Sequence, residues 1–137
     1  RKGLEKKIIK NLLKVFDNLR SSRDDLIVAI GPAISKENYS IDKKTLEEFY
    51  RNSEDKKLTG NLNKTKKDFD FIDFHNSKEE NLNQLDLRRF AYKQLLNESI
   101  PKKNIDISNL CTYNLKNEFN SWRRSKTISR QLNLICS

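Results

Sequence analysis

The sequence lacks methionine and contains few residues of several other types: one histidine, two cysteines, three glycines and two prolines among 137 residues. The histidine, His75, lies far along the chain from both Cys111 and Cys136. A zinc site needs about three or four converging ligands. Two cysteines also form no disulfide framework. The composition therefore favours a reduced protein and gives no support to a metal centre within this chain.

Long hydrophobic runs are absent as well. No apolar segment approaches the roughly 20 residues that cross a bilayer, and no charged-then-apolar secretory leader is present. We therefore expect a soluble, cytoplasmic protein with no membrane partner. Because the sequence begins at Arg1 and contains no methionine, we expect either a processed start or the later portion of a longer polypeptide.

Positive charge is in excess, with 28 Lys and Arg against 19 Asp and Glu and a formal net charge of +9. Such a charge attracts polyanions in general. The lysines are spread through segments such as "NLNKTKK" and "KKNID", whereas a nucleic-acid footprint gathers on one face or helix. The pattern favours a general residue bias and makes nucleic acid an unlikely partner, although a basic nucleic-acid-binding module stays as an alternative function.

Apolar periodicity predicts three helices. Residues 4–19 repeat apolar side chains at steps of three and four, as an amphipathic helix does. A second helix is expected within 41–52, with Asp42 as N-cap, and a third within 84–101, ending before Pro101.

Strands are predicted between these helices. The run "LIVAIGP" is typical of a buried strand that ends at Gly31 and Pro32, and "DFDFIDF" alternates like a half-buried strand. Segments 104–108 and 130–136 are expected to be closing strands, whereas 52–67 has almost no apolar content and predicts a mobile loop. The 137 residues are thus expected to form a single α+β (mixed α/β) domain, with a sheet covered by helices.

The most informative local feature is an arginine cluster near the end of the chain, formed by Arg123, Arg124 and Arg130 beside Ser121. Guanidinium groups bind phosphate and carboxylate through a planar fork, so the cluster is a candidate anion pocket. A solvated basic turn is an equal alternative. Trp122 either stacks on a base or packs in the core.

Other chemically suggestive residues have simpler interpretations. His75 is expected to be a partly exposed residue at a strand end, and the cysteines small buried hydrophobes. Gly31 and Pro32 form a turn of the kind that often lines a ligand crevice, and Asp86 is positioned to cap the third helix.

Four motifs occur in one order along nearly the whole chain: "IGPAISKENYSI", "LDLRRFAYKQLL", "LCTY" and "FNSWRRSKTISRQLNLI". Their order and spacing resemble the later half of the YfiH-like family of polyphenol oxidase (laccase) proteins and purine nucleoside phosphorylases. The resemblance implies the layered sandwich of that family. The residues that match its motifs are Gly31, Pro32, Ile34, Tyr39, Leu85, Asp86, Leu87, Cys111, Thr112, Phe119, Ser121, Arg123, Arg124, Thr127 and Arg130.

The chain also departs from the family pattern. Residues 35–38 replace a common Gly-Pro-Cys-Cys, and Trp122, Ser125 and Ser129 replace tyrosine, aspartate and glycine. The family implies a zinc (formerly called copper) site of two histidines and one cysteine in an earlier half, and neither His75 nor Cys111 matches those ligands.

The resemblance implies the C-terminal portion of a purine nucleoside phosphorylase or deaminase-type metalloenzyme. Its partners would be a purine nucleoside, phosphate and the remainder of the same polypeptide, and an alternative family role is peptidoglycan-precursor editing. The arginine wall would neutralise an anion. A metal-free binding or scaffold relative is a further alternative.

We predict that this chain alone is inactive and holds no stoichiometric zinc or copper, because the family's ligands are missing from its sequence. Metal analysis of the purified chain tests this. One tightly held zinc ion per chain would contradict it.

Overall fold

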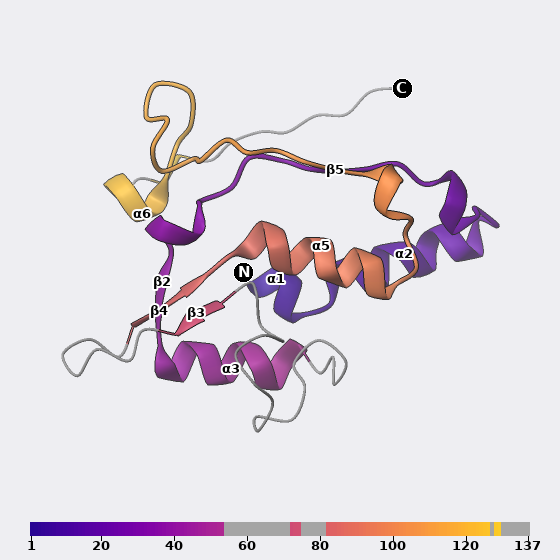
Figure 1. Cartoon of the computed structure of the whole chain (residues 1–137), viewed down its shortest axis with the longest axis horizontal. Helices are drawn as coiled ribbons and strands as arrows, with labels where there is room; N and C mark the ends of the chain where they lie inside the picture. Colours follow the sequence, from indigo (N-terminus) through magenta and orange to yellow (C-terminus); the bar gives the residue numbers. More distant parts are fainter. Residues whose placement is uncertain (54–71, 75–81, 127, 130–137) are drawn as a thin grey trace.

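The computed structural model describes residues 1–53, 72–74, 82–126, 128 and 129 (Figure 1). The helices are α1 (Lys2–Glu5), α2 (Ile8–Asn18), α3 (Lys43–Ser53), α5 (Leu87–Asn97) and α6 (Trp122–Ser125). The strands are β1 (Val28–Ile30), β2 (Ser40–Asp42), β3 (Ile72–Phe74), β4 (Leu82–Leu85) and β5 (Ile105–Ile107). The predicted α+β class is confirmed. Within the described ranges, no helix combines the length and apolar character needed to span a membrane.

The first predicted helix is divided in two. Lys7 adopts a left-handed conformation, with φ of 58°, and separates α1 from α2. The break lets Leu4 pack against one core cluster while Ile9 and Leu13 pack against another. A straight helix over 4–19 would present these side chains along one continuous stripe. The prediction of a single helix was wrong, because tertiary packing overrides the local periodicity.

The strands form two small sheets among the described residues. β1 pairs with β5 in parallel, and the other sheet is antiparallel with the order β2-β4-β3. The strand predicted in "LIVAIGP" is confirmed at Val28–Ile30, where it ends before Gly31. The prediction that it is buried was wrong, because Val28 and Ile30 are only half-buried and Ala29 is exposed.

Two strands were not predicted. β4 lies in a segment of mixed polar sequence, "LNQL", whose buried Asn83 and Leu85 are fixed by pairing with both β2 and β3. β2 directly precedes α3, where only a helix was expected. Both strands depend on partners distant in the sequence, which local patterns do not reveal.

Several predictions fall partly or wholly outside the described residues. These are the loop at 54–67, the first part of "DFDFIDF", and the closing strand at 130–136. Asn52 lies in α3, as the predicted helix over 41–52 indicates, and Ser53, which was predicted to lie in the loop, is the last residue of α3. The strands predicted at 72–74 and 105–107 are confirmed.

Helix α5 joins two core clusters. Phe90 packs in the cluster of Ile41, Leu46, Phe49, Ile72 and Leu85, and its ring centroid lies 4.5 Å from that of Phe49. Leu95 packs with Leu13 and Ile100 in the second cluster. Figure 1 shows α5 running through the middle of the molecule between the β2–α3 region and the β1–β5 pair.

The ends of α5 are set by local chemistry. Asp86 is its N-cap, as predicted, and accepts a hydrogen bond from the N–H of Arg89 at 2.9 Å. At the other end Ser99 takes a left-handed conformation, with φ of 65°, and the N–H of Ile100 donates to the carbonyl of Leu95. The helix thus ends before Pro101, as the sequence indicates.

Replacing this cap measures its contribution to stability. Asp86→Ala removes the acceptor for the Arg89 N–H and is expected to lower the free energy of unfolding by about 1 kcal/mol. Asp86→Ser keeps an acceptor and should lose much less. Urea denaturation of both variants checks this, and equal losses would show that the cap itself is not the cause.

Candidate functional site

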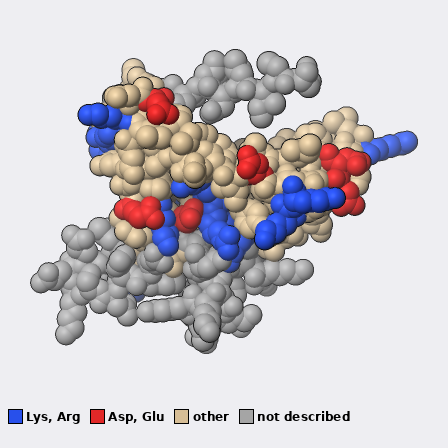
Figure 2. Space-filling view, turned by 45° about the horizontal axis from the view of Figure 1, so that its top comes forward, with Lys and Arg blue, Asp and Glu red and all other residues tan. Residues whose placement is uncertain are grey.

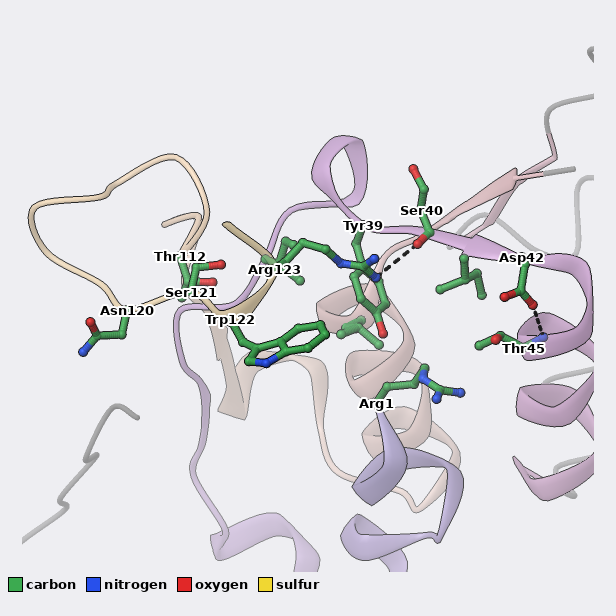
Figure 3. A pocket seen from close by; sticks show the side chains of 13 residues that line it. Arg1, Tyr39, Ser40, Asp42, Thr45, Thr112, Asn120, Ser121, Trp122 and Arg123 are labelled. Atoms are coloured by element: carbon green, nitrogen blue, oxygen red, sulfur yellow. Dashed lines mark hydrogen bonds between the residues drawn. The ribbon is translucent and has the colours of Figure 1, made fainter. Parts of the chain in front are cut away.

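A pocket of about 620 Å³ lies where β2, the start of α3 and the start of α6 meet (Figure 3). Its walls come from three distant parts of the chain, together with Arg1. The lining residues are Arg1, Ile34, Tyr39, Ser40, Ile41, Asp42, Thr45, Leu87, Thr112, Asn120, Ser121, Trp122 and Arg123. Eight of the residues singled out in the sequence therefore meet here: Ile34, Tyr39, Asp42, Leu87, Thr112, Ser121, Trp122 and Arg123.

Arg123 is held at the pocket by two contacts. Its guanidinium carbon lies 5.0 Å from the centroid of the Tyr39 ring, and one of its nitrogens donates to the carbonyl of Ser40 at 3.2 Å. Arg1 lies further along the pocket in Figure 3, and its guanidinium pairs with Glu5. Two arginines thus line the pocket, and the charge of one of them, Arg1, is already paired with Glu5.

Trp122 is an exposed aromatic wall. The residue is 55% exposed, which excludes the core position that was one of its two sequence-based interpretations. The ammonium group of Lys126 lies 3.9 Å from the centre of the Trp122 ring. Lys126 thus covers one face of the indole, and Trp122 forms part of the pocket lining.

One carboxylate, that of Asp42, lines this pocket. Asp42 accepts a hydrogen bond from the N–H of Thr45 at 2.6 Å, which confirms it as the predicted cap of α3. Hydrogen bonding by the Thr45 backbone and then its side chain lowers the pKa of Asp42. Asp42 is therefore a charged acceptor at neutral pH. The sequence indicated its cap role, but its place in the pocket follows from the direct junction of β2 with α3.

Arg124 has a different role from its neighbour Arg123. It is half-buried, and its guanidinium donates to the carbonyls of Thr112 (2.9 Å), Tyr113 and Phe119 (2.7 Å). These carbonyls belong to an irregular segment that has few ladder hydrogen bonds, so Arg124 satisfies acceptors that would otherwise lack partners. The structure places it outside the pocket lining, away from the predicted anion pocket.

Arg88 supports the same segment from α5. Its guanidinium donates to the carbonyls of Ser108 at 2.7 Å and Leu110 at 3.2 Å. Two arginines thus hold the backbone on both sides of Cys111. The sequence offered no clear signal for this role, because carbonyl partners in irregular segments leave no residue pattern.

Two of the matching motifs are adjacent in space. Ala33, just after Gly31 and Pro32, bridges to Cys111, and the N–H of Thr112 donates to the Ala33 carbonyl at 3.1 Å. Gly31 and Pro32 themselves are not part of the pocket lining. A Cβ at Gly31 would meet no atom within 4 Å, so no close approach requires glycine there.

Cys111 is buried, as predicted, inside a hydrogen-bonded cluster. Its Sγ lies 3.3 Å from both the N and Oγ atoms of Ser35, and Asn38 donates to Ser35 Oγ at 2.9 Å and to Asn114 at 3.1 Å. Burial raises the thiol pKa, but hydrogen bonds from the Ser35 side chain and backbone, and from the Asn114 and Tyr113 backbones, outweigh it. They lower the pKa of Cys111 from 9.0 to about 7.

Other predicted residues do not enter the pocket or cannot be placed. Asp86 caps α5, whereas Arg130, Thr127, His75 and Cys136 lie outside the described residues. Within the described ranges, no three His, Cys, Asp or Glu side chains converge as metal ligands. The described residues therefore do not fit the zinc or copper ion that the resemblance implies.

Positively and negatively charged side chains are interspersed on the molecular surface shown in Figure 2. On the face shown in Figure 2, Lys and Arg side chains form separate groups with Asp and Glu between them. A continuous basic face is the usual footprint of nucleic-acid binding. This face therefore gives that alternative no support.

The lowered pKa of Cys111 predicts a measurable titration. In a Cys136→Ser background, thiolate absorbance at 240 nm should rise with a midpoint near pH 7, and Ser35→Ala should move the midpoint towards 9.0. The folded-state pKa lies below the unfolded value, so the thiolate's contribution to stability is fully present above pH 9 and is lost as the pH falls through 7. A midpoint near 9 in both proteins would contradict this.

Comparisons with known proteins agree with the motif order. The sequence model of the family described as multi-copper polyphenol oxidoreductase laccase matches residues 1–137. The crystal structure of Bacillus licheniformis hypothetical protein YfiH is similar, with a TM-score of 0.53 and 26% identity, over 72% of this chain and 32% of YfiH. No curated protein is significantly similar. The chain thus spans about a third of the length of YfiH, and it belongs to the multi-copper polyphenol oxidoreductase laccase family.

Proposed function

We propose that this chain supplies the wall that binds nucleoside and phosphate in a purine nucleoside phosphorylase-type or deaminase-type enzyme of this family. The single observation that carries the proposal is the pocket of about 620 Å³ that brings Trp122, Tyr39, Arg123 and Arg1 together. An aromatic wall, the Arg123 guanidinium and one carboxylate match the three chemical parts of a nucleoside–phosphate pair: base, anion and sugar.

Trp122 supports binding of a purine ring. The indole is more than half exposed at the pocket, and stacking of a base on an aromatic side chain contributes about 1–3 kcal/mol. The positive charge of Lys126 against the ring anchors the indole near the pocket. The family motif has tyrosine at this position, and an indole offers a larger stacking surface.

Arg123 supports binding of the anion. A guanidinium has five N–H donors, and the contact with Ser40 uses one nitrogen. The Tyr39 ring fixes the plane of the group, so its remaining donors are directed before the ligand arrives. Pre-organised donors bind phosphate with less loss of side-chain entropy.

Asp42 and neighbouring hydroxyl groups support binding of the sugar. The Asp42 carboxylate can accept hydrogen bonds from ribose hydroxyls, while Thr45, Thr112 and Ser121 line the same pocket. The chain's own contribution to the reaction is then to hold the base, orient the sugar and neutralise the anion. These residues bind and position the substrate, so we expect binding without turnover by this chain alone.

The proposal predicts a direct fluorescence signal, because Trp122 is the single tryptophan of the chain. Inosine with phosphate should change its emission in a saturable way. Arg123→Ala should weaken the effect of phosphate by about tenfold or more, the usual consequence of losing a charged hydrogen bond. Arg123→Lys should retain part of it.

Arg20→Gln provides the matched control, because Arg20 is exposed at the end of α2 and does not line the pocket. It should bind like the unaltered chain. Emission that stays constant at millimolar inosine and phosphate, or equal phosphate dependence in Arg123→Ala and Arg20→Gln, would contradict the proposal.

A further inference from the structure

The hydroxyl group of Tyr39 has no hydrogen-bond partner in the described part of the chain. Tyr39 is half-buried and lines the pocket. Figure 3 shows its hydroxyl between the Trp122 indole on one side and Asp42 on the other, with Arg1 below. A tyrosine that is removed from water usually hydrogen-bonds through its hydroxyl. This group is therefore placed to contact a ligand.

The remaining atoms of Tyr39 already have roles within the protein. The ring packs against the core cluster that contains Phe90 and lies under the Arg123 guanidinium. The Tyr39 N–H donates to the carbonyl of Lys36 at 3.0 Å, and its own carbonyl accepts from the N–H of Leu85 at 3.1 Å. Phenylalanine could make all of these contacts, so none of them explains the hydroxyl.

The position of Arg123 indicates which group of a ligand the hydroxyl meets. The guanidinium carbon of Arg123 lies 5.0 Å from the centre of the Tyr39 ring, and one nitrogen is held by the Ser40 carbonyl. An anion that approaches Arg123 from the pocket therefore comes close to the hydroxyl at the edge of the same ring. An ionised acceptor also forms a stronger hydrogen bond than a neutral one, which favours the anion over an atom of a nucleoside.

We infer that the Tyr39 hydroxyl donates a hydrogen bond to the same oxyanion that Arg123 binds. The aromatic ring orients the arginine, and the hydroxyl contacts the ligand. Because the phenol is neutral, it adds affinity and direction without adding charge to the pocket. The inference rests on the proposed function for the identity of the anion, which is phosphate.

Tyr39→Phe tests the hydroxyl alone, because it keeps the ring under Arg123. Inorganic phosphate is titrated into the chain and its binding is followed by the line width of the phosphorus NMR signal. The Kd for phosphate should rise about tenfold, the usual effect of losing a hydrogen bond to a charged group. Urea denaturation should give the same midpoint as for the unaltered chain, since the hydroxyl has no partner among the described residues.

Tyr92→Phe is the matched control. Tyr92 lies on α5, outside the pocket lining, and the guanidinium carbon of Arg89 lies 5.5 Å from its ring centre. The control therefore removes a hydroxyl from another tyrosine that has an arginine over its ring. Its Kd for phosphate should equal that of the unaltered chain.

The ionic-strength dependence of binding separates a direct contact from an effect on Arg123. Salt screens the attraction between charges, so Arg123→Ala should make the Kd less sensitive to salt. Tyr39→Phe should keep the full sensitivity, because it removes only a neutral donor. A loss of sensitivity in Tyr39→Phe like that in Arg123→Ala would overturn the inference, by showing that the variant acts through a displaced arginine.

Inosine alone, followed by Trp122 emission, distinguishes this inference from the proposed function. Phosphate binding that is weaker in Tyr39→Phe supports the inference even if the unaltered chain does not bind inosine, a result that contradicts the proposed function. Weaker inosine binding with unchanged phosphate binding would overturn the inference and leave the proposed function standing. Equal phosphate binding by Tyr39→Phe and the unaltered chain, or none by the unaltered chain, would also overturn it.

Discussion

The position of α5 is the constraint on which the rest of the structure depends. Phe90 and Leu95 lie on this one helix but pack into different core clusters, so α5 sets the placement of the β2–α3 region relative to α2 and the β1–β5 pair. The same helix starts at the pocket with Leu87 and holds the backbone before Cys111 through Arg88. Burial of the two clusters therefore also determines the geometry of the candidate site.

Arg123 and Arg124 are neighbours in the sequence but have different roles: Arg124 stabilises the backbone beside the pocket, and Arg123 lines the pocket. Arg124 donates to three backbone carbonyls and fixes the irregular segment from Thr112 to Phe119. Arg123 lies over Tyr39 beside the pocket. The Arg124 guanidinium thus satisfies backbone carbonyls, whereas the Arg123 guanidinium lines the pocket. Trp122 stands where the family motif has tyrosine, and it gives the pocket wall beside Arg123 a larger aromatic surface.

Local signals predicted the parts of the fold that local chemistry controls. Asp86 and Asp42 were identified as helix caps because a cap is encoded within four residues, and both are confirmed. The break at Lys7 and the strand β4 were missed, since each depends on packing or pairing with distant residues. The sequence singled out Arg123, but not the separate role of Arg124, because nothing local distinguishes two consecutive arginines.

The central claim is that the pocket at Arg123 and Trp122 binds a purine nucleoside beside an anion. The most direct test is a crystal structure of the chain soaked with inosine and phosphate. The account predicts the hypoxanthine ring stacked on Trp122, with phosphate within hydrogen-bonding distance of the Arg123 guanidinium. An empty pocket, or phosphate bound only at lysines on the outer surface, would contradict it.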